Sequence, residues 1–335
     1  MRFDDVYLAG CGSFLPPAMS AEEALRQGLT DSGTVAGTGM RGVTVSGGLS
    51  GPEMAVQAGR RALDASGLSP TDIDLVTFSA LYYTGHDMWA AASYVQRGAV
   101  GGRCPAVEVR QTSNGGMAAL DLAASYLAGG RYAALLTCGD RFCPPGIDRW
   151  RSDPGTVFAD GGAAVVLARG GGFARLRSIV IGSDTELEQM HRGDDPFSPA
   201  PLRLRSPLDV RHTTRAFLRA VGTSYALSRM EAGQAEVVKA ALAEADLDPS
   251  AIDLFVLPHF GRRRMETGFF RPLGVPPERT TWEWARGVGH LGAGDQFAGL
   301  AWLRDSGRLR AGQRCALIGV GGGFSWSCAV LEIVS

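Results

Sequence analysis

The strongest constraint on the fold is an internal repeat that relates the two halves of the sequence. Ala62-Leu63, Leu68, Pro70 and Ile73-Asp74-Leu75 recur as Ala241-Leu242, Leu247, Pro249 and Ile252-Asp253-Leu254. Every pair is separated by the same 179 positions, from 62 to 241 and from 75 to 254. A repeat of this length predicts a duplicated structural unit.

Each copy predicts an alanine-rich helix, a proline turn and a buried strand, over 73–80 and over 252–257. Segments 130–136 and 312–318 also resemble each other, and in each a turn leads into an apolar strand. Further strands are expected over 6–10 and 163–168, a central apolar helix over 117–127, and a helix over 214–232. The alternation of helix and strand predicts an α/β protein with two similar halves, 1–170 and 171–335.

Length and charge exclude several classes of protein. The 335 residues carry a formal net charge of −1, so no general basic field attracts nucleic acid or an anionic membrane. No apolar run reaches the roughly 18 residues that span a bilayer, and Asp4 and Asp5 stand where a signal peptide carries positive charge. We expect a cytoplasmic protein. Six scattered cysteines lack metal-site spacing, so no metal is expected.

The first candidate for chemistry is Ser113, within the segment 107–116. A strand there runs into a short turn, and an apolar helix follows. A hydroxyl at a helix N-terminus faces free N–H groups and the positive end of the dipole, which is how such a turn presents a nucleophile. Serine is also a common N-cap, so both interpretations stay open.

Two histidines and a glycine run follow in the second half. His259 ends the strand of the second repeat, and His290 lies in the glycine-rich loop 289–295. The glycines 321–323 allow a backbone to approach a ligand closely. A lone histidine is more often structural, so none of these features is specific by itself.

Taken together, these segments resemble the β-ketoacyl-[acyl carrier protein] synthase III family of the thiolase superfamily. The matching segments are Thr38-Gly39-Met40-Arg41, Phe158 to Ala163, Pro258-His259, Gly289 to Asp295 and Gly321 to Trp326. The resemblance implies a thiolase-like five-layer α-β-α-β-α fold built from two duplicated halves, a homodimer and an acyl-transfer activity.

The sequence departs from this family at the nucleophile. The family's cysteine aligns with Ser113, whose hydroxyl is not ionised near neutral pH and needs a general base. The family's asparagine aligns with His290, and Asp295 lies five residues further on. These departures predict a Ser113–His290–Asp295 triad. The resemblance implies an oxyanion hole from the N–H groups of Ser113 and Gly322.

Two of these roles have alternatives. Asp295 could instead cap a helix over 296–303, a position that aspartate favours. His259 could hold the incoming acceptor or assist as a second base, and whether His259 or His290 is the base for Ser113 stays open.

The donor is expected to be an acyl-pantetheine thioester, with no resident cofactor. Arg264 matches an arginine that the family uses to meet its carrier, and with Arg262 and Arg263 it could attract phosphate or an acidic acyl carrier protein. A solvated basic turn is the alternative. Gly33 and Gly37 occupy the family's adenine-clamp positions, which favours a carrier protein over free coenzyme A.

Three side chains are candidates for the acyl pocket. Met88 and Trp89 fall in the segment that crosses the dimer interface in the family, and Phe324 lies in the C-terminal motif. An adaptable methionine beside aromatic walls favours a bulky or aromatic acyl group. Simple packing of a dimer core is the alternative for Met88 and Trp89.

The sequence therefore predicts an acyltransferase, and its resemblance to serine-bearing members of the family implies a setting in polyketide or antibiotic biosynthesis. It would move an aryl or short starter group from a carrier or coenzyme A thioester, through acyl-Ser113, to a second carrier thiol, a hydroxyl or an amine. One alternative is a priming ketosynthase that condenses with a malonyl carrier and releases carbon dioxide. The other is a non-catalytic partner subunit.

Overall fold

The computed structural model describes residues 1–335, and its core is a nine-stranded mixed sheet in the order β5-β4-β6-β7-β1-β8-β11-β10-β9. The strands are β1 Tyr7–Phe14, β4 Ile73–Ser79, β5 Ala106–Glu108, β6 Ala133–Asp140, β7 Gly161–Ala168, β8 Ala174–Ser183, β9 Leu254–Val256, β10 Arg314–Gly321 and β11 Ser325–Ile333. A separate ribbon joins β2 Ala18–Ser20 to β3 Gly42–Thr44. Strands β1 and β8 share only two registered pairs, so the sheet consists of two halves with a narrow joint.

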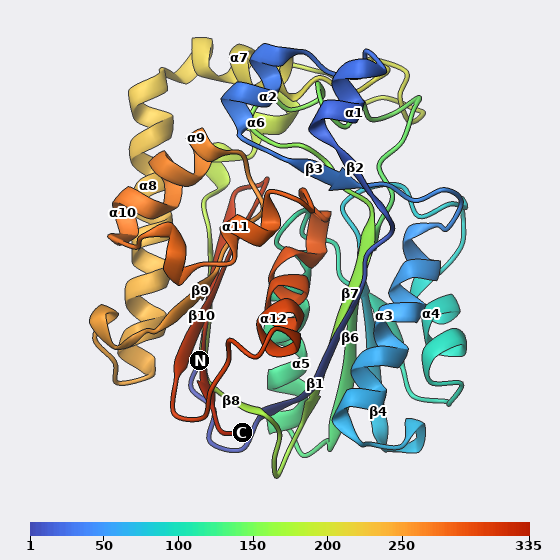
Figure 1. The fold of residues 1–335 in the computed structure, drawn as a ribbon, viewed down its shortest axis with the longest axis vertical. Helices are drawn as coiled ribbons and strands as arrows, with labels where there is room; N and C mark the ends of the chain where they lie inside the picture. Colours follow the sequence, from blue (N-terminus) through green and yellow to red (C-terminus); the bar gives the residue numbers. More distant parts are fainter.

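The two half-sheets and their helices form five layers (Figure 1). Helices α3 (Gly51–Ser66) and α4 (Ala91–Ala99) cover the first half-sheet, and α8 (Thr223–Glu244) covers the second. Helices α5 (Gly115–Ala128) and α12 (Asp295–Asp305) lie between the half-sheets. The predicted α-β-α-β-α arrangement is confirmed. The central position of α5 explains its apolar composition, because most of its surface packs against other elements. Leu122 is an exception and is 57% exposed in the single chain.

The remaining helices are short or lie at the rim. They are α1 Ala21–Arg26, α2 Ser32–Thr38, α6 Gln189–Arg192, α7 Val210–Val221, α9 Arg262–Met265, α10 Arg271–Leu273 and α11 Trp282–Ala285. Helices α2, α6, α7 and α9 gather at the end of the molecule that is drawn at the top of Figure 1. No helix combines the length and apolar composition needed to cross a bilayer.

The internal repeat has the same structure in both halves. Helix α3 leads through a short turn at Pro70–Asp72 into β4, and α8 leads through Pro249–Ala251 into β9. Ser69 and Asp248 cap these turns, each just before its proline. Strand β4 then runs parallel to β6, and β9 runs parallel to β10. Strands β7 and β8 lie on either side of the predicted boundary at 170/171.

Two elements differ from the prediction. The helix expected over 214–232 is two helices, α7 and α8, which meet at Gly222. Gly222 has a φ of 91°, a conformation that glycine adopts without steric cost, so the chain turns there. Strand β1 extends to Phe14, beyond the predicted 6–10, because it pairs with β7 along its whole length.

Candidate active site

Ser113 lies on a tight turn between β5 and α5. The Asn114 amide donates to the Gln111 carbonyl at 3.0 Å, and the Gly115 amide donates to the Thr112 carbonyl at 3.1 Å. Thr112 has a φ of 47°, an uncommon conformation for a β-branched residue that signals local strain. The N-cap of α5 is Asn114, without a side-chain cap bond, so the capping role considered for Ser113 is excluded.

The Ser113 side chain faces His290 instead. Ser113 Oγ lies 2.8 Å from His290 Nε2, and His290 Nδ1 lies 2.6 Å from Asp295 Oδ2. His290 is 2% exposed and Asp295 is 1% exposed. A carboxylate only accepts hydrogen bonds, so the imidazole proton is on Nδ1 and Nε2 accepts from the hydroxyl. This is the geometry of a nucleophile, its base and an orienting carboxylate.

Asp295 is committed to this network and does not cap α12. The N-cap of α12 is Gly294, without a side-chain cap bond, so the capping alternative is excluded. Asp295 Oδ1 accepts from the Leu291 amide at 2.8 Å, and Oδ2 also accepts from the His259 amide at 2.8 Å. Burial pushes the pKa of Asp295 upward, but His259 and His290 outweigh burial and hold it below its usual value. Asp295 is therefore ionised.

The backbone of His290 is held by the segment 157–159. The His290 amide donates to the Val157 carbonyl at 2.9 Å, and the Ala159 amide donates to the His290 carbonyl at 2.8 Å. The rings of Phe158 and Phe260 lie 5.8 and 5.3 Å from the His290 ring. These apolar walls lower the local dielectric and strengthen the polar contacts of His290.

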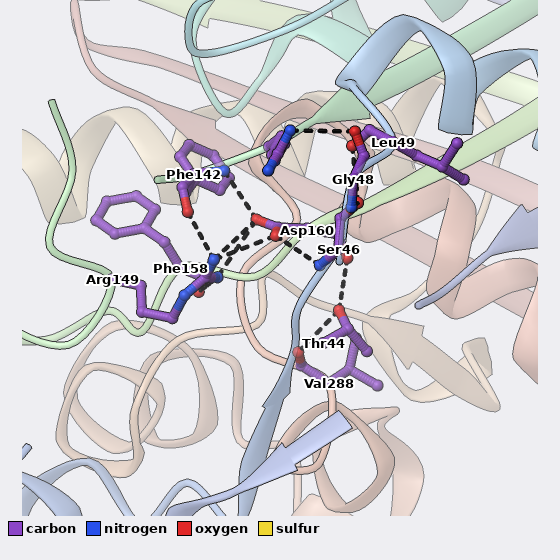
Figure 2. Close-up of polar contacts among 10 residues, drawn as sticks. Thr44, Ser46, Gly48, Leu49, Phe142, Arg149, Phe158, Asp160 and Val288 are labelled. Carbon is purple, nitrogen blue, oxygen red and sulfur yellow. Dashed lines mark hydrogen bonds and ion pairs between the residues drawn. The ribbon is translucent and has the colours of Figure 1, made fainter. Parts of the chain in front are cut away.

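The next residue, Asp160, anchors that segment (Figure 2). Its carboxylate accepts from the amides of Ser46 and Phe142, both at 2.8 Å, and pairs with Arg149 at 3.1 Å. Asp160 is 1% exposed. A buried ion pair of this kind fixes the relative position of the segments that it joins. Asp160 thus supports the strand-like contact that positions His290.

His259 also contacts the Asp295 carboxylate but forms no hydrogen bond with Ser113. Its Nδ1 lies 3.0 Å from the Gly289 carbonyl and 3.3 Å from Asp295 Oδ1. The ring stands edge-on to Trp284, with centroids 5.2 Å apart. His259 is 0% exposed, and its Nε2 has no hydrogen-bond partner. Burial lowers the pKa of His259, although Asp295 opposes this, so the ring is neutral near pH 7.

The glycine loop 321–323 closes over the turn that carries Ser113. Thr112 Oγ1 donates to the Gly322 carbonyl at 3.1 Å. A side chain at Gly321 would overlap Thr112 and Gln111, which explains the glycine. The amides of Ser113 and Gly322, the predicted oxyanion donors, donate no hydrogen bond within the chain. Both N–H groups are free to meet a ligand.

His191 was not found by sequence reasoning. Its Nδ1 lies against Gly322 so closely that a Cβ on that glycine would overlap it, and its ring meets Phe324 edge-on at 5.3 Å. Desolvation by the surrounding protein lowers the pKa of His191, although Asp153 opposes this and part of the residue is exposed. His191 lies in α6, within the polar segment 184–212, and no motif in that segment marks it as a site residue.

The three predicted carrier-binding arginines are not equivalent. Arg262 and Arg263 are exposed, and the Arg262 guanidinium lies 5.4 Å from the ring centre of Trp282. Arg264 instead pairs in bidentate geometry with Asp153, at 2.6 Å for both bonds. Burial raises the pKa of Asp153, but Arg264 outweighs it and the net shift is downward. The Arg264 side chain is still 41% exposed in this pair, and carrier binding by the three arginines stays a prediction.

The candidate pocket residues are separated in the single chain. Met88 is 108% exposed in the single chain. Trp89 packs against His86 and Tyr94, with ring centres 5.3 and 5.6 Å apart. Phe324 is buried beside Trp326, with ring centres 6.1 Å apart. Only Phe324 lies near the glycine loop of the site.

Comparison with known proteins agrees with this geometry. Residues 107–185 match the family model described as 3-Oxoacyl-[acyl-carrier-protein (ACP)] synthase III, and residues 242–333 match the model of its C-terminal part. A beta-ketoacyl-[acyl-carrier-protein] synthase III from Rhizorhabdus wittichii is 28% identical over 332 residues, covering 96% of this chain and 98% of its own.

Solved structures show the same fold. The structure of ChlB3, named as an acyltransferase, superposes with a TM-score of 0.95 at 35% identity and covers 99% of this chain and 98% of its own. The 3-oxoacyl-[acyl-carrier-protein] synthase III of Aquifex aeolicus gives a TM-score of 0.77 at 21% identity, covering 98% and 99%. The chain is thus an enzyme of the acyl-transferring and condensing kind. Because the two family models together match more than half of its residues, it belongs to the 3-oxoacyl-[acyl-carrier-protein] synthase III family.

Proposed function

We propose that this enzyme transfers an acyl group from a thioester to an acceptor through an ester at Ser113. The observation that carries the proposal is the 2.8 Å contact between Ser113 Oγ and His290 Nε2, backed by the ionised Asp295 at 2.6 Å. A serine needs such a base, whereas a cysteine in this family position does not. A non-catalytic subunit would have no use for this arrangement.

The first half of the reaction forms the acyl-enzyme. His290 Nε2 takes the Ser113 proton as Oγ attacks the thioester carbonyl, and the same proton passes to the departing thiol as the C–S bond breaks. Asp295 stabilises the imidazolium between these events. The free amides of Ser113 and Gly322 are suited to hold the oxyanion. These steps need no resident cofactor.

The donor proposed is an acyl-pantetheine thioester on an acyl carrier protein. The names of the synthase relatives refer to acyl carrier protein. Exposed Arg262 and Arg263 at the rim offer charge to an acidic carrier or its phosphate. Gly33 and Gly37 are both exposed in α2 and provide no side chain to clamp an adenine. A coenzyme A thioester is the competing donor.

The setting proposed is the transfer of an aryl or short starter group in polyketide antibiotic assembly, by a cytoplasmic homodimer. The 35% identity with an acyltransferase over nearly the whole chain supports transfer. The fully exposed Met88 supports the dimer, because a second copy would bury it. The two similar halves, 1–170 and 171–335, would fold as one unit around α5 and α12.

The need of Ser113 for a general base gives a direct test of the proposed function. We would measure the rate of acyl-enzyme formation in four proteins: wild type, His290→Ala, Ser113→Cys and the double variant. His290→Ala should slow acylation far more in the serine enzyme than in the Ser113→Cys background, because a thiol is partly ionised without a base. Equal losses in both backgrounds would show that His290 does not act as the base for Ser113.

A further inference from the structure

The buried Nε2 of His259 is the one part of the two-histidine cluster without a partner. The residue is 0% exposed, and this nitrogen forms no hydrogen bond with any group of the chain. Buried polar atoms in proteins are nearly always paired, so an orphan on a ring that shares Asp295 with His290 points to a group supplied by the substrate. Which group it accepts depends on where the His259 proton lies.

The surroundings of His259 Nδ1 fix that proton. This nitrogen faces the Gly289 carbonyl at 3.0 Å and Asp295 Oδ1 at 3.3 Å, and neither group can donate. Nδ1 must therefore carry the hydrogen. Because the ring is neutral, Nε2 holds a bare lone pair and can only accept a hydrogen bond.

The His290 ring has the same tautomer, because its Nδ1 also faces an oxygen of Asp295. Its Nδ1 donates to Asp295 Oδ2 at 2.6 Å, and its Nε2 lone pair faces the Ser113 hydroxyl at 2.8 Å. One carboxylate thus sets the tautomer of both histidines. Neither ring offers an N–H to a substrate oxygen before it has taken up a proton.

Two histidine rings in this tautomer are unsuited to stabilise a carbon nucleophile that forms by decarboxylation. When a malonyl thioester loses carbon dioxide, negative charge gathers on its carbonyl oxygen, and an enzyme must supply hydrogen-bond donors there. A bare Nε2 would instead turn its lone pair toward that oxygen. An acceptor with a heteroatom and its own proton meets no such repulsion.

We propose that the paired tautomers of His259 and His290 restrict acyl-Ser113 to proton-bearing heteroatom acceptors, a thiol or hydroxyl, and exclude malonyl thioesters. This rests on the proposed acyl-Ser113 function and names the class of acceptor. The acceptor X–H gives its proton to His290 Nε2 as the C–X bond forms, and Ser113 Oγ receives it as the C–Oγ bond breaks. His259 Nε2 accepts a different polar hydrogen of the acceptor, such as an amide N–H of pantetheine, and orients it.

The test of the acceptor class starts from enzyme that is already acylated at Ser113. If the enzyme cannot be acylated, the proposed function is overturned before any acceptor is tested. The acylated sample is divided into two portions. One portion receives free pantetheine and the other receives malonyl-pantetheine. We expect acyl-pantetheine from the first and no carbon dioxide above the Ser113→Ala background from the second. Carbon dioxide released together with a 3-ketoacyl product would overturn the inference and leave the acyl-enzyme intact.

The tautomers themselves can be observed by nitrogen NMR on enzyme labelled with [15N]histidine. The chain has five histidines, so the imidazole spectrum is small. His259→Gln assigns the His259 signals, His290→Gln provides assignment by elimination, and exposed His86 serves as the surface reference. We expect the Nδ1-protonated tautomer for the rings of His259 and His290, and a bare Nε2 for His259, at pH 7.5. An Nε2-protonated or doubly protonated His259 would overturn the inference.

Discussion

Asp295 lies 2.6 Å from Nδ1 of His290, and its side chain is shielded from solvent. The carboxylate also accepts hydrogen bonds from the amides of His259 and Leu291 and lies near His259 Nδ1. Four contacts from three residues therefore fix its position. The orientation of the proposed base therefore depends on the first residue of α12. Substitutions at this residue should affect chemistry more than folding.

Asp295→Asn tests that dependence. An amide keeps the size of the side chain but can donate to His290 Nδ1, which favours the wrong imidazole tautomer. We expect acyl-enzyme formation to fall by roughly 10⁴-fold, the size seen when a triad carboxylate becomes an amide. Rapid-quench kinetics measures the rate. Asp305→Asn, at the exposed end of the same helix, is the matched control and should leave the rate unchanged.

Asp160→Asn should lower stability. The substitution leaves Arg149, only 14% exposed, without its buried partner, and such a loss typically costs about 3–5 kcal/mol. Glu283→Gln breaks the more exposed pair with Arg286 and should cost at most about 1 kcal/mol. Urea unfolding followed by circular dichroism compares the two. Similar midpoints for both variants would contradict the anchoring role of Asp160.

Gly322→Ala should impair the site through His191. The new methyl group would overlap His191 Nδ1, so either the ring or the glycine loop must move. We expect a loss of stability of about 1 kcal/mol, the low end for overpacking, because the exposed His191 ring can partly move aside. Removing the ring with His191→Ala should restore most of it in the double variant. Without such coupling in the double-mutant cycle, the close contact would not exist in solution.

Asp140 should make stability depend on pH. Burial raises its pKa to about 6, although amides of Leu81, Tyr82 and Ala293 oppose this. The folded state then keeps a proton that the unfolded state releases near pH 3.9, so this group's contribution to the free energy of unfolding falls as pH rises from about 4 to about 6. Above that range its contribution is constant. Asp140→Asn should flatten this part of the profile, and an unchanged slope would refute the assignment.

The sequence predicted Ser113, His290 and Asp295 as a triad, because Ser113 and His290 stand at recognisable family positions and Asp295 follows five residues later. It left open which histidine is the base and whether Asp295 caps α12, because both questions depend on tertiary contacts. It was insufficient for His191 and for the Arg264–Asp153 pair. Both contacts join segments distant in sequence, and segment 184–212 has no periodic pattern to place it. The break at Gly222 was missed because helical spacing continues on both sides of it. The residues that would contact Met88 in a dimer belong to the second copy of the chain.

The most direct test of the central claim is intact-protein mass spectrometry after incubation with a panel of acyl-carrier and acyl-coenzyme A thioesters. We predict a mass increase of one acyl group in the wild type, located on the peptide that contains Ser113, and none in Ser113→Ala. The donor that gives the faster increase identifies the carrier class. An acyl adduct of equal extent in Ser113→Ala, or none from any donor, would contradict transfer through Ser113.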